Sequence, residues 1–165
     1  MSIGLLSTGT GFSIFSDRTP AFSPSSMSDD DLSPSLNAGL KLALSSCPGA
    51  ELILLSNLYG LPIFRFSLKD RPSSLEPDPI ESIFATLFAM TAEQLEKLYF
   101  GKAQTVVASY GDVVLVQAAL HPLVLAIVAR RVNEGDADID NMLSLVQPLT
   151  NMLEPIRAKA ESLLG

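Results

Sequence analysis

Hydrophobic residues dominate the stretch VVLVQAALHPLVLAIVARR, which runs from Val113 to Arg131. A membrane-spanning helix needs about 20 consecutive apolar residues, and this run is shorter and is interrupted by Gln117 and His121-Pro122. Its many valines favour β-strands, and a His-Pro pair is typical of a turn. The pattern predicts two strands, at about 113–119 and 123–130. The second is apolar on both faces, which predicts a central strand covered by helices on both sides.

Two shorter apolar runs, Leu52–Leu55 and Leu61–Phe66, flank a turn-forming segment that contains Asn57 and Gly60. This spacing predicts a β-hairpin. Because Pro62 has no N–H to donate, the second strand is expected at an edge of the sheet, at least at its start. One further strand is predicted at about 104–110.

Three segments show helical spacing. Ser33-Pro34 is typical of a helix start, and the stripe that follows, Leu36, Leu40 and Leu44, extends to Cys47, which predicts a buried thiol. A long helix is expected from about 80 to 99, ended by Gly101. The last helix is expected from about 139, where Pro148 and Pro155 should kink or divide it.

The middle helix has more apolar surface than one sheet can cover. Its apolar residues occupy about half of its circumference, whereas packing on a single sheet requires a stripe of about 100°. Two interpretations of this excess stay open. The helix packs against its own chain on two sides, or part of its apolar surface forms an interface with a partner. The apolar residues are Ile83, Phe84, Leu87, Phe88, Met90, Leu95, Leu98 and Tyr99.

The element order is therefore α-β-β-α-β-β-β-α, which predicts an α+β domain over residues 33–165. We expect a five-stranded antiparallel sheet with the middle helix on one face and the first and last helices on the other. Residues 1–32 are rich in serine and contain the acidic run Asp29–Asp31. Such a segment buries too little apolar surface to fold, so a flexible N-terminal tail is expected, or one that orders only against a partner.

Composition and motifs provide no positive evidence for an enzyme. The net charge of -7 argues against nucleic-acid binding, which requires a basic patch. His121 is the only histidine and Cys47 the only cysteine, so a multi-histidine metal site and an intramolecular disulfide are both excluded. A calcium loop starting at Asp136 fails at its sixth and twelfth positions, and an acidic helix N-terminus is the better interpretation. No cofactor or metal is expected.

The stretches ELILLSNLYGLPIFRF, ESIFATLFAMTAEQLEKLYFGKAQTVVASYGDVVLVQ, HPLVLAIVA and LSLVQPLTNMLEPIR, in this element order, resemble the roadblock/LC7 superfamily. Within it they are most similar to MAP-kinase scaffold subunits of the late-endosomal and lysosomal Ragulator complex. The resemblance covers about residues 34–164. It implies a roadblock/LC7-like fold and a non-enzymatic scaffold or adaptor that forms a heterodimer with a second roadblock-domain protein through the middle helix and the strand after it.

The resemblance also implies a place in the cell and a set of partners. The dimer would join a Ragulator-like assembly on the cytoplasmic face of late endosomes and lysosomes, with membrane contact only through partners, and would be cytosolic otherwise. That assembly would recruit Rag-type GTPases and a MAP-kinase kinase. Alternatives are a roadblock or longin-like trafficking subunit for a different small GTPase, and a GTPase-activating role for Arg130 or Arg131. The residues expected at the partner interface are Ile83, Phe84, Leu87, Met90 and Val107.

Overall fold

The computed structural model describes residues 33–68 and 79–164. The expected tail, residues 1–32, lies outside the described residues, so the predictions made for it stay predictions. The elements follow the expected order and confirm the α+β class. They are α1 (Pro34–Ser45), β1 (Ala50–Asn57), β2 (Pro62–Ser67), α2 (Pro79–Lys97), β3 (Thr105–Tyr110), β4 (Val113–Leu120), β5 (Leu123–Arg130) and α3 (Ile139–Leu164).

The five strands form one antiparallel sheet in the order β2-β1-β5-β4-β3. The hydrophobic stretch at 113–131 folds as β4 and β5, and β5 is the central strand, as predicted. The strand that begins at Pro62 is an edge strand, also as predicted. In the part of the chain that the structure describes, none of the helices has the length and apolar character needed to cross a membrane.

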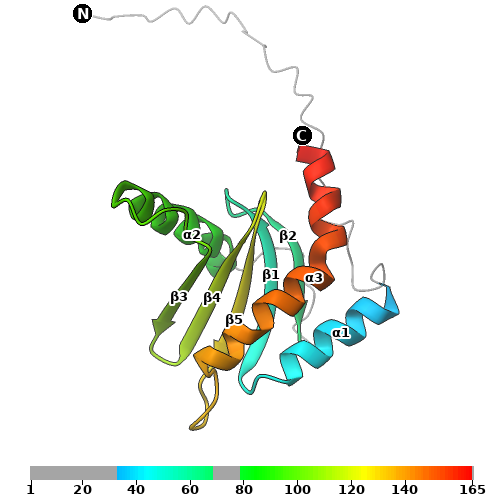
Figure 1. Cartoon of the computed structure of the whole chain (residues 1–165). Coiled ribbons are helices and arrows are strands. Elements are labelled where there is room, and N and C mark those ends of the chain that lie inside the picture. Colours follow the sequence, from blue (N-terminus) through cyan, green and yellow to red (C-terminus); the bar gives the residue numbers. More distant parts are fainter. Residues whose placement is uncertain (1–32, 69–78, 165) are drawn as a thin grey trace, which may run out of the picture.

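Helices cover the sheet on both faces (Figure 1), with α2 on one side and α1 and α3 on the other. Successive side chains of a strand point to opposite faces, so each strand supplies both layers. On β1, for example, Ile53 and Leu55 join the core under α1 and α3, while Leu54 joins the smaller cluster under α2. The larger core therefore lies between the sheet and the α1–α3 layer.

Helices α1 and α3 cross closely. Gly39 of α1 lies against the thioether of Met152 of α3, and a Cβ added at Gly39 would be 2.9 Å from that sulfur. Helix α3 is not divided by Pro148 and Pro155, but it changes direction along its length (Figure 1), which is the kink that the sequence allowed. Cys47 is buried in the core, as predicted.

Polar side chains cap the N-termini of α1 and α3, the two helices on this face of the sheet. The Ser33 hydroxyl oxygen accepts a hydrogen bond from the Leu36 N–H at 3.3 Å, which confirms the predicted start of α1. The acidic segment before α3 behaves in the same way. Asp138 accepts from the N–H of Asp140 at 3.1 Å, and Asp136 accepts from the N–H of Asn133 at 2.7 Å. The aspartates therefore order the loop and the N-terminus of α3.

Candidate protein-binding surface

Two polar contacts fix α2 on its face of the sheet. Near its start, both carboxylate oxygens of Glu81 accept from Nε of Arg65 on β2, each at 3.1 Å. Further along, Nε2 of the buried Gln117 on β4 donates to the carbonyl oxygen of Phe84 at 2.5 Å. The helix is thus attached near its N-terminus and in its first half to two strands that are far apart in the sheet.

The structure separates the four predicted interface residues on α2 into two pairs. Phe84 and Leu87 point inward and pack against a cluster formed by Leu54, Leu115 and Ala126. Ile83 and Met90 point outward and are 59% and 60% exposed. They are seven positions apart, close to two helical turns, so they share one outer face. Phe84 and Leu87 therefore explain how α2 binds its own sheet, and Ile83 and Met90 form an apolar surface on its far side.

The fifth predicted residue, Val107, lies on the other face of the sheet. It is paired with Val116, which belongs to the core under α1 and α3, whereas its neighbours Val106 and Ala108 pack on the α2 side. Residues directly opposite each other on paired strands share a face. Val107 is 38% exposed because β3 is an edge strand that pairs only with β4 among the described residues. The structure therefore does not bring Val107 together with Ile83 and Met90 on one face.

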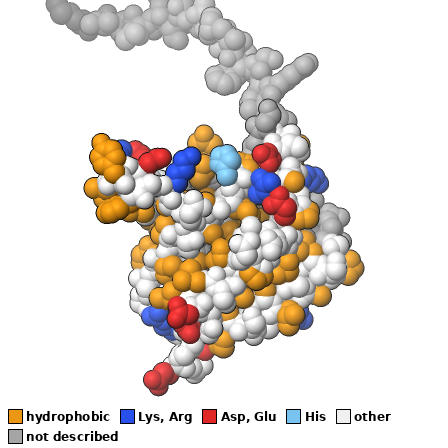
Figure 2. All heavy atoms as spheres, viewed as in Figure 1, with side chains coloured by type: hydrophobic (Ala, Val, Ile, Leu, Met, Phe, Trp, Pro, Cys, Tyr) orange, Lys and Arg blue, Asp and Glu red, His pale blue; other side chains and the backbone are white. Residues whose placement is uncertain are grey.

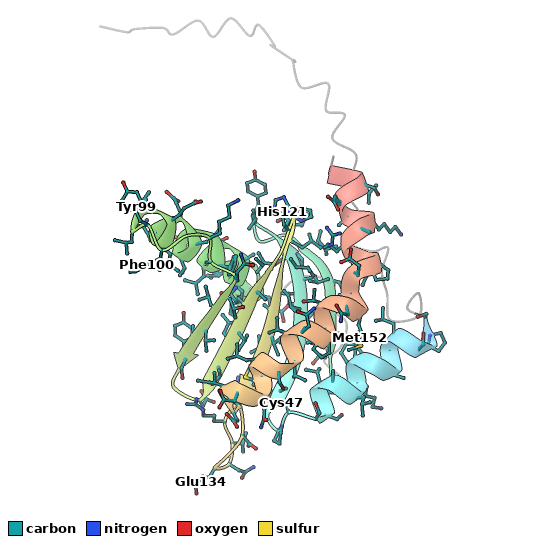
Figure 3. The ribbon with its side chains drawn as sticks, in the orientation of Figure 1. Cys47, Tyr99, Phe100, His121, Glu134 and Met152 are labelled. Atoms are coloured by element: carbon teal, nitrogen blue, oxygen red, sulfur yellow. The ribbon has the colours of Figure 1, made fainter. Side chains whose placement is uncertain are left out.

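The end of α2 carries a group of exposed apolar side chains that are not among the predicted interface residues. Leu98, Tyr99 and Phe100 are all exposed, and Tyr99 is 96% exposed. Figure 3 shows Tyr99 and Phe100 at the far end of α2, beyond the edge formed by β3, and Figure 2 shows hydrophobic side chains gathered at this tip. The signal in the sequence was an aromatic pair directly before Gly101. Gly101 was predicted to end the helix, but α2 ends earlier, at Lys97.

The charged residues around these elements form local pairs. On α2, Nζ of Lys97 contacts the Glu93 carboxylate at 2.6 Å, and this hydrogen bond holds the pKa of Glu93 below its usual value. At the other end of β3, Nη1 of Arg130 contacts the Asp112 carboxylate at 2.6 Å. That hydrogen bond, followed by one from the backbone of Asp112 itself, lowers the pKa of Asp112. Arg130 is therefore already engaged by an acidic partner.

Groups with the potential for other chemistry lie apart from this surface. The Cys47 thiol is buried just past the C-terminus of α1, and burial, followed by the negative charge of Asp138, raises its pKa. His121 is exposed in the turn between β4 and β5, where its carbonyl oxygen accepts from Arg157 at 3.1 Å. Within residues 33–68 and 79–164, no three histidine, cysteine, aspartate or glutamate side chains are grouped so that they could hold a metal ion.

The fold defines the class of protein. Similar solved structures include a roadblock/LC7 domain from Streptomyces avermitilis, with a TM-score of 0.57, 18% identity and coverage of 73% of this chain and 95% of that one. The gliding protein MglB from Thermus thermophilus has a TM-score of 0.59 at 17% identity, with coverage of 75% and 89%. MglB from Myxococcus xanthus has a TM-score of 0.58 at 11% identity, with coverage of 76% and 97%. The chain thus has the roadblock/LC7 fold.

A protein-family model gives the narrower assignment. Residues 35–160 match the family described as "Mitogen-activated protein kinase kinase 1 interacting". This match covers most of the chain, and the chain belongs to that family. A search of curated proteins finds no match. The family and the fold together confirm the resemblance inferred from the sequence.

Proposed function

We propose that this chain is a non-enzymatic adaptor that pairs with a second roadblock-domain chain, and that the pair presents a MAP-kinase kinase to its signalling partners. The observation that carries the proposal is the exposed outer face of α2, with Ile83 and Met90, together with the edge of β3, which pairs only with β4 among the described residues. Exposed apolar side chains on a helix and an unpaired strand edge both promote association with another chain. The family description supports a kinase kinase as a further partner.

The position of Val107 indicates the kind of pairing. A partner that only covered α2 would leave Val107 exposed, since this residue lies on the opposite face of the sheet. A partner strand placed along β3 would contact side chains on both faces of that strand, including Val107. We therefore propose that the partner continues the sheet across two chains while its own helix packs beside α2. A two-fold arrangement of this kind makes the two third strands antiparallel neighbours.

The larger setting is part of the proposal. The pair would belong to a Ragulator-like assembly that recruits Rag-type GTPases at the cytoplasmic face of late endosomes and lysosomes. Its contact with the membrane would come only through other subunits. The sequence resemblance supports this setting, and a tagged chain should lose its endosomal location when pairing is abolished.

The experiment uses a panel of purified roadblock-domain chains from the same organism, with this chain itself included. Each is mixed with this chain and examined by size-exclusion chromatography with light scattering. We expect one panel member to form a stable pair, which Met90→Glu and Val107→Lys weaken. Leu42→Glu is the matched control, because Leu42 is an exposed apolar residue on α1, which packs on α3 and β1. Pairing with no panel member would overturn the proposal, and pairing that withstands both Met90→Glu and Val107→Lys would overturn the proposed interface.

The second step tests the kinase partner. The purified pair is immobilised and exposed to purified MAP-kinase kinase 1, with each single chain as a control. Binding by the pair and catalytic activity of the kinase kinase that is unaltered by it are expected of an adaptor. A pair that fails to bind would restrict the function to the pairing itself and would contradict the kinase part of the proposal.

A GTPase-activating role is the alternative, and it depends on Arg130 or Arg131. The contact between Arg130 and Asp112 does not favour it, because that guanidinium would have to leave an acidic partner before it could reach a nucleotide. Stimulated hydrolysis of GTP by a small GTPase, lost in Arg130→Ala or Arg131→Ala, would establish this role in place of a purely passive adaptor.

A further inference from the structure

The C-terminus of α2 has an unusual backbone conformation. The N–H of Phe100 bonds to the carbonyl of Leu95 at 3.2 Å, and the N–H of Tyr99 bonds to the carbonyl of Glu96 at 3.0 Å. These two bonds are the pair that defines a Schellman motif, in which the residue at the position of Tyr99 has left-handed backbone angles and is usually glycine. Here a tyrosine occupies that position, with φ of 60°.

A tyrosine is a costly choice for this position. Left-handed backbone angles bring a Cβ close to the following carbonyl, so bulky side chains rarely adopt them. The aromatic ring does not offset the strain through packing, since Tyr99 is 96% exposed. A strained residue whose side chain packs on almost nothing in the described part of the chain is typical of a residue held in place for function. Tyr99 is thus placed for contact beyond the residues that the structure describes.

The neighbouring residues make this end of α2 an apolar tip, which we define as Leu98, Tyr99 and Phe100. Phe100 is 76% exposed and Leu98 is 62% exposed. Exposed aromatic side chains that are grouped in this way are typical of the anchors that carry most of the energy of a protein interface. Gly101, with φ of 83° and open space around its α-carbon, follows the tip and turns the chain back toward β3.

The position of the tip indicates which partner it meets. It joins the end of α2 to the start of β3, the two elements of the proposed pairing surface, and it projects beyond the β3 edge, away from its own sheet (Figures 1 and 3). If the third strands of two chains are antiparallel, the start of one strand lies opposite the end of the other. The tip then reaches the flank of the second chain where that chain's third strand ends and turns into its fourth.

We propose that the apolar tip anchors the second roadblock chain by docking on that flank. This inference rests on the proposed function. It assigns to the tip an energetic role separate from those of the helix face and the strand edge. It also explains why a tyrosine stands where glycine would relieve the strain.

Tyr99→Gly tests the inference directly, because it should weaken binding without lowering the stability of the fold. Glycine suits the left-handed position, so we expect the thermal unfolding temperature of the isolated chain to stay equal or rise. Affinity for the paired panel member should fall about tenfold or more, as for other aromatic anchors. Phe100→Ala should weaken pairing in the same way. Tyr59→Ala is the control, since Tyr59 is an equally exposed tyrosine in the turn before the opposite edge strand.

The outcomes separate this inference from the proposed function. Pairing that withstands Tyr99→Gly and Phe100→Ala but is lost in Met90→Glu would overturn the role of the tip and leave the adaptor proposal standing. Equal losses in Tyr99→Gly and Tyr59→Ala would also overturn it. Pairing that withstands every one of these variants would remove the proposed interface itself. A photo-crosslinking amino acid at position 99 should label the partner near the end of its third strand, and labelling elsewhere would contradict the docking geometry.

Discussion

Nε of Arg65, on the edge strand β2, donates to both carboxylate oxygens of Glu81 in the first turn of α2. The Arg65 Nε lies 3.1 Å from each carboxylate oxygen, and the Glu81 side chain is almost completely buried while Arg65 is partly exposed. A buried carboxylate is costly unless it is paired and hydrogen-bonded. This contact therefore holds the start of α2 against one edge of the sheet.

Replacement of Arg65 by methionine should destabilise the chain more than an ordinary surface substitution. Arg65→Met leaves the Glu81 carboxylate buried without its partner, and we expect a loss of about 2 kcal/mol in the free energy of unfolding. Equilibrium unfolding in urea measures it. The double variant Arg65→Met, Glu81→Leu removes the orphaned charge and should regain most of the stability. If the urea midpoint of Arg65→Met equalled that of the native chain, the pair would not contribute to stability.

Gly49 should tolerate substitution less well than Gly101, Gly111 and Gly135, which also have left-handed backbone angles. Its φ is 85°, and an added Cβ would collide with the carbonyl oxygen of Arg130 and lie 3.1 Å from the backbone nitrogen of Ala137. Both neighbouring residues are held by backbone hydrogen bonds, because the Arg130 N–H donates to the Gly49 carbonyl and the Ala137 N–H donates to the Pro48 carbonyl, each at 2.8 Å. We expect Gly49→Ala to cost about 3 kcal/mol or more, measured as the shift of the urea midpoint.

Gly135→Ala is the matched control for Gly49→Ala. Gly135 has φ of 90°, nearly the same as Gly49, but no atom lies within 4 Å of the added Cβ. Only the left-handed strain remains there, and it should cost about 1 kcal/mol. Equal losses at the two positions would show that the steric contact at Gly49 is relieved by movement of the loop.

Most of the fold was predictable because its strands and helices have clear periods. The valine-rich run at 113–131 divides at His121-Pro122 into two strands, and Asn57 and Gly60 supply the hairpin turn, where the Asn57 side chain accepts from the N–H of Leu61 at 2.9 Å. The Arg65–Glu81 contact was not predictable, because the length of the connection between β2 and α2 does not determine which of their residues meet.

The candidate surface was predictable only in part. When apolar residues cover half of a helix, the sequence does not indicate which of them face the sheet. Phe84 and Ile83 both belong to that apolar half, and only the packing of α2 shows that Phe84 faces inward and Ile83 outward. The face occupied by Val107 depends on the register of β3 against β4. Tyr99 was expected inside the helix, but it lies just past its end in a left-handed conformation. Only the hydrogen bonds at the end of α2 make that visible.

Stability should fall in acid and stay level near neutral pH. The pKa values of Glu93, Asp112 and Glu154 are lowered in the folded chain, in each case first by a hydrogen bond from a lysine or arginine side chain. Carboxyls with a folded pKa below the unfolded one contribute stability above the unfolded value and lose it as pH falls. The urea midpoint should therefore be flat from about pH 6 to 8 and decline below about pH 5. Asp112→Asn should make that decline shallower, and an unchanged slope would contradict the assignment to Asp112.

The Cys47 thiol should be unreactive in the folded chain. It is buried, and burial raises its pKa, so both access and the thiolate fraction are low. A thiol reagent added at about pH 8 should modify it slowly, at a rate set by opening of the core, and rapidly once urea unfolds the chain. The double variant Ser46→Cys, Cys47→Ala moves the thiol to an exposed neighbouring position and should react at once. Fast modification of the native chain would mean that α1 opens readily from the sheet.

The two pairs of apolar residues on α2 should separate stability from pairing. Phe84→Ala and Leu87→Ala remove side chains that pack on Leu54 and Leu115, so each should lower the free energy of unfolding by about 2–3 kcal/mol. Ile83→Ala and Met90→Ala remove exposed side chains and should change it by less than about 0.5 kcal/mol. Urea unfolding of the four isolated variants provides these values.

The same four variants are then compared in the pairing assay at a temperature where all of them are folded. Ile83→Ala and Met90→Ala should weaken the pair, because a partner that buries the outer face of α2 loses apolar contact area. Phe84→Ala and Leu87→Ala should weaken it less, because these two side chains pack on this chain's own sheet. If Ile83→Ala and Met90→Ala instead destabilised the isolated chain as much as Phe84→Ala, the outer face of α2 would have to be covered by this chain's own residues. The apolar excess of the helix would then be explained without a partner.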